Sequence, residues 1–161
     1  MTDLLELLQE FYRDKLAELL NHERSARIAF PYDVNNTYQY ILNRDETHLS
    51  WVRSAITDLK GAVPDEVSNS SATDAARIQD WRALTEQDAA RAQALVDRWR
   101  PRVDAMTHAR HRSMLGVILG EALEQKRSFE QALSGRDDLL GRRTDAVGSR
   151  VGRVLATRWI E

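Results

Sequence analysis

The stretch from Val34 to Lys60 carries the longest regular hydrophobic pattern in the chain. Its inward positions recur in alternating steps of three and four residues, the spacing that places side chains on one stripe of an α-helix. The stripe consists of Tyr38, Ile41, Asp45, His48, Val52, Ala55 and Leu59. Asp45 and His48 are therefore predicted to point into the protein, where an unpartnered carboxylate or imidazole destabilises a fold by several kcal/mol.

Three further segments show the same helical periodicity. The predicted helices cover residues 3–30, 34–60, 73–99 and 102–134, and the prolines at positions 31, 64 and 101 fall between them. No segment has the alternation of a β-strand. Long helices joined by mostly short loops predict an all-α protein with a four-helix bundle over residues 1–134.

The predicted connections lie at Pro31, in the linker from Val63 to Thr73, and around Pro101 to Asp104. Gly61 is expected to provide the left-handed cap that ends the second helix. The linker is long enough to cross the bundle extended and short enough to make a turn, so both routes stay open. The start of the fourth helix is also open, because Pro101 either opens that helix or bends the end of the third.

Residues 135–161 form a predicted irregular C-terminal tail, because four of the seven glycines lie there: Gly135, Gly141, Gly148 and Gly152. The tail mixes arginines with many apolar residues, including Trp159 and Ile160. This is too apolar for a disordered segment. We therefore expect the tail to pack on the bundle or on a partner chain, and the protein to form a homo-oligomer, namely a dimer.

Other inward polar residues fall at the level of Asp45 and His48 when residues are counted along the helices. On the first helix Glu18 matches by level and Glu23 by face. On the third helix Asp88 matches by both. On the fourth helix the matching residues are His111 to Met114 or, if that helix starts after Asp104, Glu121, with Glu124 beside it.

Composition narrows the function classes. The formal net charge is -2 and the pI is about 6.1, which argues against a nucleic-acid-binding protein that works by bulk electrostatics. The chain has no cysteine, so disulfides, thiolate metal sites and a cysteine nucleophile are excluded. No run has membrane-spanning length, and the first residues lack a signal-peptide pattern, which favours a cytoplasmic protein without membrane contact.

Three motifs together resemble the ferritin-like superfamily, and its rubrerythrin-like branch most. They are Asp45-x-x-His48, the sequence Leu59-Lys60-Gly61-Ala62-Val63-Pro64, and Gly120-Glu121-Ala122-Leu123-Glu124-Gln125. In that superfamily two iron or manganese ions are held by one Glu from each of two helices and a Glu-x-x-His from each of the other two. The resemblance thus implies a ferritin-like four-helix bundle that binds iron or manganese.

Carried over by position, the resemblance implies metal ligands at Glu23 (or Glu18), Asp45, His48, Asp88, Glu121 and Glu124. Two positions depart from the pattern. Asp45 stands where the family has Glu, and Glu124 stands where it has His.

A second hypothesis is a metal-free helical binding or assembly module with a salt-bridged core. In it, Asp45 and His48 pair with an arginine of a neighbouring helix, namely Arg24, Arg110 or Arg112. His22 is expected to be exposed. The metal content of protein purified without chelator separates the two hypotheses.

Overall fold

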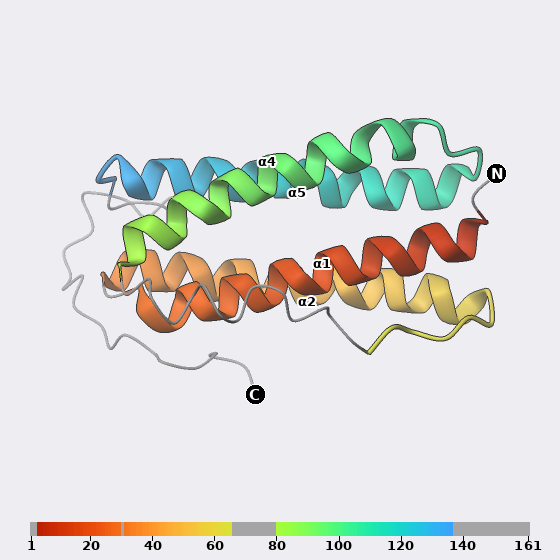
Figure 1. The fold of residues 1–161 in the computed structure, drawn as a ribbon, viewed down its shortest axis with the longest axis horizontal. Coiled ribbons are helices and arrows are strands. Elements are labelled where there is room, and N and C mark those ends of the chain that lie inside the picture. Colours follow the sequence, from red (N-terminus) through yellow and green to blue (C-terminus); the bar gives the residue numbers. More distant parts are fainter. Residues whose placement is uncertain (1–2, 30, 66–79, 137–161) are drawn as a thin grey trace, which may run out of the picture.

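The structure is a computed structural model, and it describes residues 3–29, 31–65 and 80–136. Within these ranges the chain forms no strand and four α-helices: α1 (Leu4–Ile28), α2 (Tyr32–Asp58), α4 (Trp81–Asp104) and α5 (Ala109–Leu133). They make up an all-α four-helix bundle, as predicted (Figure 1). Apart from its first two residues, the predicted C-terminal tail lies outside the described residues, and with it the prediction for Trp159 and Ile160.

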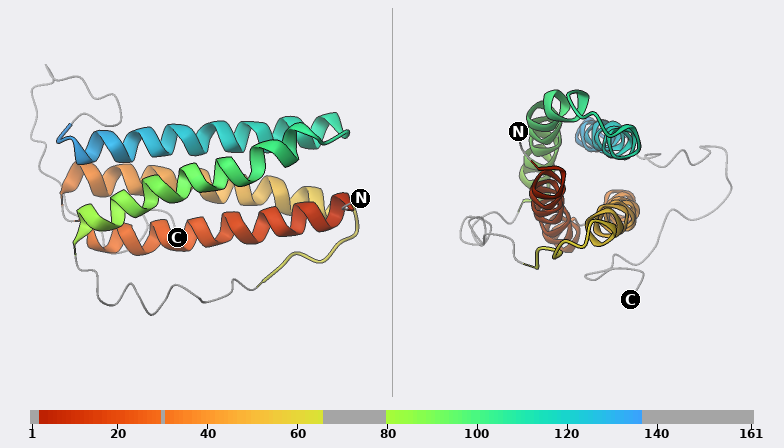
Figure 2. Two further views of the ribbon diagram at one scale, coloured as in Figure 1. Left: turned by 45° about the horizontal axis from the view of Figure 1, so that its top comes forward. Right: turned by 90° about the vertical axis from the view of Figure 1, so that its right-hand side faces the viewer.

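The four helices stand at the corners of a square when the bundle is viewed along its axis (Figure 2). α1 pairs with α2 and α4 pairs with α5, while α1 also lies beside α4 and α2 beside α5. Neighbouring helices run in opposite directions (Figure 1). As a consequence α2 and α4, which follow one another in the chain, run in the same direction.

The connection from α2 to α4 has to span the length of the bundle. Just after α2, the carbonyl of Ala62 accepts a hydrogen bond from the side chain of Gln9 near the start of α1. α4 begins at the other end, where Arg82 donates to the carbonyl of Leu133 at the end of α5. α2 therefore ends and α4 begins at opposite ends of the bundle, which excludes a local turn between them. Ferritin-like bundles have one such crossover, although this topology alone does not identify a family.

The helix ends follow local sequence, with one difference around Pro101. Asp3 accepts a hydrogen bond from the backbone of Leu5 and so caps the start of α1. Pro101 does not end the third helix, because α4 continues to Asp104 and α5 begins only at Ala109. The later start of α5 is the alternative that places Glu121, and not His111, at the level of His48.

The end of α2 differs from the prediction in which residue is left-handed. Lys60 has a positive φ of 57° and takes the place expected for Gly61. The amide of Gly61 then donates to the carbonyl of Ile56, as in a common helix end. Gly61 meets a different requirement, because the side chain of Leu5 occupies the space that a Cβ atom at Gly61 would need.

Buried aromatic side chains meet near both ends of the bundle. At the end where α1 begins, Phe11 and Trp99 are fully buried and meet edge to face with ring centroids 5.0 Å apart. At the opposite end the rings of Tyr38 and Phe129 lie 5.2 Å apart. Burying each such side chain stabilises the fold by roughly 1.5–3 kcal/mol. Between these two aromatic contacts lies a polar layer.

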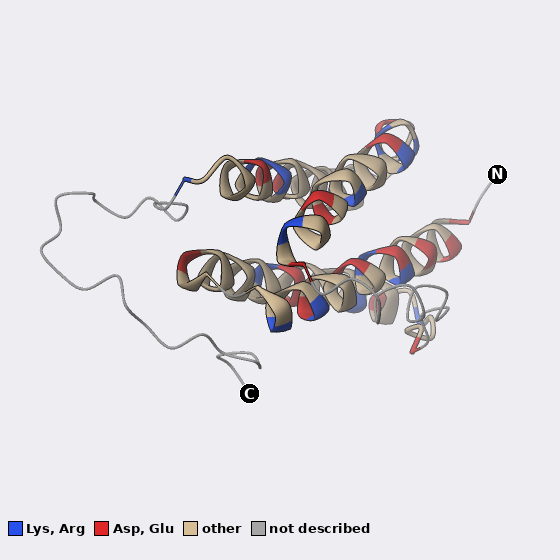
Figure 3. Cartoon of the chain, turned by 60° about the vertical axis from the view of Figure 1, so that its left-hand side comes forward, with Lys and Arg blue, Asp and Glu red and all other residues tan. Residues whose placement is uncertain are grey.

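The outer surfaces of the helices carry acidic and basic residues interspersed along their length (Figure 3). This distribution agrees with the formal net charge of -2. No helix among the described residues is long and apolar enough to cross a membrane.

Candidate functional site

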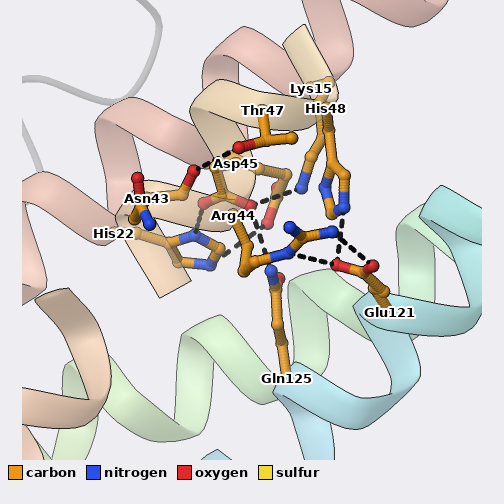
Figure 4. A network of polar contacts seen from close by, with 10 residues as sticks. Lys15, His22, Asn43, Arg44, Asp45, Thr47, His48, Glu121 and Gln125 are labelled. Carbon is orange, nitrogen blue, oxygen red and sulfur yellow. Dashed lines mark hydrogen bonds and ion pairs between the residues drawn. The ribbon is translucent and has the colours of Figure 1, made fainter. Parts of the chain in front are cut away.

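The polar layer halfway along the bundle is the candidate site, and we call it the polar centre. All four helices surround it, and three of them, α1, α2 and α5, supply its side chains (Figure 4). Its members are Lys15, Glu18, His22, Arg44, Asp45, His48, Glu121 and Gln125.

Asp45 accepts three hydrogen bonds at the middle of the polar centre. Lys15 Nζ lies 2.6 Å from Oδ1, and Gln125 Nε2 lies 3.1 Å from the same oxygen. His22 Nδ1 lies 2.5 Å from Oδ2. Burial raises the pKa of Asp45, but the charges of Lys15 and His22 outweigh burial and hold the pKa well below its usual range. Asp45 is thus an ionised carboxylate with both oxygens engaged.

His22 is buried, with 1% of its surface exposed, so the expectation of an exposed His22 was wrong. Burial lowers the pKa of His22, yet the charge of Asp45 and the hydrogen bond to it raise the pKa above 6.5 overall. The second ring nitrogen, Nε2, lies 3.8 Å from a carboxylate oxygen of Glu18. Burial raises the pKa of Glu18. His22 therefore favours the charged imidazolium form beside Asp45.

His48 is in the opposite state. Its pKa is lowered by burial and by the charge of Lys15, despite the nearby carboxylate of Glu121. His48 Nε2 lies 2.6 Å from Glu121 Oε2, and because a carboxylate only accepts, Nε2 carries the proton of the neutral ring. Arg44 also binds Glu121 through two hydrogen bonds, of 3.0 and 2.7 Å, and these lower the pKa of Glu121.

Asp88 is buried as predicted, but it belongs to a neighbouring group and does not contact Asp45. Its Oδ2 accepts hydrogen bonds from Tyr38 at 2.6 Å and from Ser25 at 2.5 Å. Burial, followed by the charge of Asp88, raises the pKa of Tyr38 well above 10.0. His22 lies between the two carboxylates, and the charge of Asp88 contributes to its raised pKa.

The six residues implied as metal ligands do not converge on one point in this structure. Asp45, His48 and Glu121 lie together, and Asp88 forms the adjacent group. Glu124 is exposed, and Glu23 is only half-buried. On α1 it is Glu18, the alternative matched by level, that enters the polar centre.

Sequence reasoning missed the residues of α1 that neutralise Asp45. The expected arginine partners were Arg24, Arg110 and Arg112, whereas the structure gives this role to Lys15 and His22. A detectable signal was present in the sequence. The positions 8, 11, 15, 18, 22, 25 and 29 alternate in steps of three and four, and all seven are buried. This stripe was overlooked because four of its members are polar.

The donor set does not fit a shared metal ion in this arrangement. The ammonium group of Lys15 lies against Asp45, and Arg44 engages both oxygens of Glu121. Positive charge therefore already sits on the carboxylates that an ion would need. Within the described residues, no group of three or more His, Asp or Glu side chains is placed to hold a metal ion.

Comparisons with protein families, with curated proteins and with solved structures found no match to this chain.

Proposed function

We propose that this protein is a metal-free helical binding module whose polar centre is a salt-bridged structural core. One observation carries the proposal: Lys15 Nζ lies 2.6 Å from Asp45 Oδ1, with the two side chains 1% and 0% exposed. A buried carboxylate needs a positive partner, and a lysine on α1 supplies it.

The charges of the polar centre are balanced by the protein's own side chains. Lys15 and the raised pKa of His22 supply positive charge around Asp45, and Arg44 supplies it at Glu121. A divalent cation placed here would meet the ammonium group of Lys15, which repels it. The arrangement supports a role in which the polar centre fixes how the helices pack.

The binding role is supported by a feature outside the polar centre. A cavity with a volume of about 250 Å³ opens between α2 and α5. Pockets between helices are among the usual places where helical bundles bind small molecules.

The test is metal content together with thermal stability. Protein purified without chelator, and protein incubated with excess Fe²⁺ or Mn²⁺ and then desalted, should contain substoichiometric metal. Its melting temperature should not change with EDTA or with added ions, because a ligand that binds the native state raises the melting temperature. Stoichiometric iron or manganese that is lost in His48→Ala and kept in His108→Ala would overturn the proposal.

Iron or manganese binding is the second candidate function, and one observation favours it. His22 Nε2 and His48 Nδ1 are buried and have no hydrogen-bond partner among the described residues. The nitrogen of a neutral imidazole, such as His48 Nδ1, is a common metal ligand, whereas His22 has to lose a proton before it can bind a metal. This candidate requires Lys15 to leave Asp45, and the same metal analysis decides between the two. The predicted homodimer is a separate expectation, which light scattering of the purified chain measures.

A further inference from the structure

The cavity between α2 and α5 lies where α2 ends and α5 begins. Its walls combine apolar and polar side chains: Trp51, Ala55, Asp58, Arg110, His111 and Met114. Its volume is about 250 Å³. A cavity of roughly 150 Å³ is known to hold benzene, so this one has room for a ring that carries a short side chain.

Trp51 gives the cavity a fixed aromatic wall. The ring centroids of Trp51 and His48 lie 5.5 Å apart, and the guanidinium carbon of Arg44 lies 5.8 Å from the centroid of the Trp51 ring. Because His48 and Arg44 are both held by Glu121, the polar centre holds the wall in place. An apolar ligand would therefore meet a preformed surface, which reduces the entropy lost on binding.

His111 gives the cavity a buried polar atom without a partner. The residue is 9% exposed, and its Nε2 has no hydrogen-bond partner among the described residues. Burial, together with His108 and Arg110, lowers the pKa of His111, so the ring is neutral at pH 7. Buried polar atoms of native proteins are usually hydrogen-bonded, so an unpartnered one in a residue that lines a cavity is a candidate to bind a ligand.

The start of α5 adds positive potential at the same wall. α5 is 25 residues long, its first turn contains no acidic residue, and Arg110 lies in that turn. A helix N-terminus carries a partial positive charge, so an arginine there is unfavourable unless an anion is nearby. Arg110 and the helix terminus together favour an anion beside His111.

We infer that this cavity binds a small monocarboxylic acid with an apolar, ring-sized body. The carboxylate accepts hydrogen bonds from the guanidinium group of Arg110 and from His111 Nε2, in the neutral tautomer that has its proton on this nitrogen. The apolar body lies on Trp51 and Met114. Asp58 also lines the cavity, and its negative charge opposes the ligand carboxylate, so Arg110 and the start of α5 have to outweigh it. A second negative group, as in a dicarboxylate or a phosphate ester, is disfavoured further. This inference rests on the proposed binding role and names its ligand class.

The test is a titration of the full chain with 3-phenylpropionate, followed by calorimetry and by tryptophan fluorescence. The matched neutral probe is 3-phenylpropionamide, which has the same body without the charge. We expect the acid to bind at least about tenfold more tightly than the amide, since hydrogen bonds to an ionised group are the stronger ones. Equal affinity of the two probes, or no saturation with the acid up to its solubility limit, overturns the inference.

Substitutions of lining residues test whether the ligand binds in this cavity. Arg110→Gln and His111→Gln should each weaken binding of the acid at least about fivefold. Arg127→Gln is the matched control, because Arg127 is exposed on the same helix and does not line the cavity. Met114→Trp should fill the cavity and abolish binding of both probes. A loss in Arg127→Gln as large as in Arg110→Gln, or full binding by Met114→Trp, shows that the ligand binds elsewhere.

Failure of this inference is distinguishable from failure of the proposed function. Metal content measured on the same protein samples tests the polar centre, and the titration tests the cavity. Stoichiometric metal with carboxylate binding would overturn the metal-free role and keep the cavity site. Metal-free protein that does not bind the acid would overturn the cavity site and the support it gives to a binding role, and would keep the metal-free, salt-bridged core.

Discussion

Two ion clusters attach α1 to the other helices, and they differ in how much water reaches them. In the polar centre, Lys15 and His22 of α1 bind Asp45 of α2, and the three side chains are 1%, 1% and 0% exposed. The second group, which we call the surface cluster, joins α1 to α4, and its side chains are 23% to 54% exposed. It consists of Glu10, Asp14, Arg98 and Arg102.

Both clusters lower the pKa of a carboxyl group. Loss of the ion partners is nevertheless expected to change the stability of the fold by different amounts in the two clusters. The hydrogen bond from Arg102 is the main cause that lowers the pKa of Glu10 to about 2. In the polar centre, Lys15 and His22 lower the pKa of Asp45 against the opposing effect of burial. If Glu10 loses its partners, water solvates the carboxylate. If Asp45 loses its partners, its buried carboxylate is left without solvation. Losing an ion pair is therefore expected to cost much more free energy of unfolding in the polar centre than in the surface cluster.

The largest effect is expected for Asp45→Ala. The variant leaves the ammonium group of Lys15 buried without its counter-ion and removes the acceptor of His22 and Gln125. Breaking a buried pair by removing one partner typically lowers the free energy of unfolding by about 3–5 kcal/mol. Urea denaturation at pH 7 measures the change.

The matched control is Asp97→Ala, which removes an exposed carboxylate that accepts a hydrogen bond from Gln93 on its own helix. Its free energy of unfolding should stay within about 0.5 kcal/mol of the unsubstituted protein. If Asp45→Ala is no more destabilising than this control, the distinction between the polar centre and the surface cluster is wrong.

The next effect concerns pH and separates His22 from His48. The pKa of His22 is raised above 6.5 in the folded state, so its contribution to stability is complete below pH 6.5 and is lost as pH rises through the folded pKa. The pKa of His48 is lowered, so protonation of His48 lowers stability as pH falls below 6.5. The destabilisation caused by His22→Asn should therefore shrink as pH rises from 6.5 into the alkaline range.

Ring-nitrogen chemical shifts measure the two states directly. At pH 6.5 we expect His22 to be mainly protonated and His48 mainly neutral, with its proton on Nε2. A neutral His22 at that pH would contradict the assignment, because the charge balance around Asp45 depends on it.

The sequence predicted one side of the polar centre and missed the other. Asp45 and His48 of the polar centre, and Asp88 of the neighbouring group, were found because each interrupts an otherwise apolar stripe, and helical periodicity fixes which way such residues point. Lys15 and His22 were missed because the buried stripe of α1 that contains them is mostly polar, and a long charged side chain is by default assigned to the surface. Only the acid on α2 makes burial of Lys15 favourable, and that contact joins residues distant in the sequence.

The positions that the linker joins and the start of α5 could not be predicted from the sequence, for two different physical reasons. The linker after Val63 is long enough for either route, so the choice depends on how the two helical hairpins pack. The sequence leaves open whether Pro101 opens the fourth helix or bends the end of the third, and in the structure Pro101 lies inside α4. A proline near the end of a helix removes one backbone donor and leaves the following turn intact, so the sequence fits either alternative. Where α5 begins decides whether Glu121 or His111 lies beside His48, so the composition of the site depended on the role of Pro101.

The smallest effect is expected in the surface cluster, for Glu10→Gln. Glu10 accepts hydrogen bonds from Arg98 at 2.6 Å and from Arg102 at 2.7 and 2.9 Å, so the geometry resembles that of a strong ion pair. Because these side chains are solvated, the loss in the free energy of unfolding should be only about 0.2–1 kcal/mol. The loss should shrink further in high salt, which screens exposed charges and leaves the effect of Asp45→Ala almost unchanged. A salt-independent loss as large as that of Asp45→Ala would mean that exposure does not separate the two clusters, and that geometry alone sets their strength.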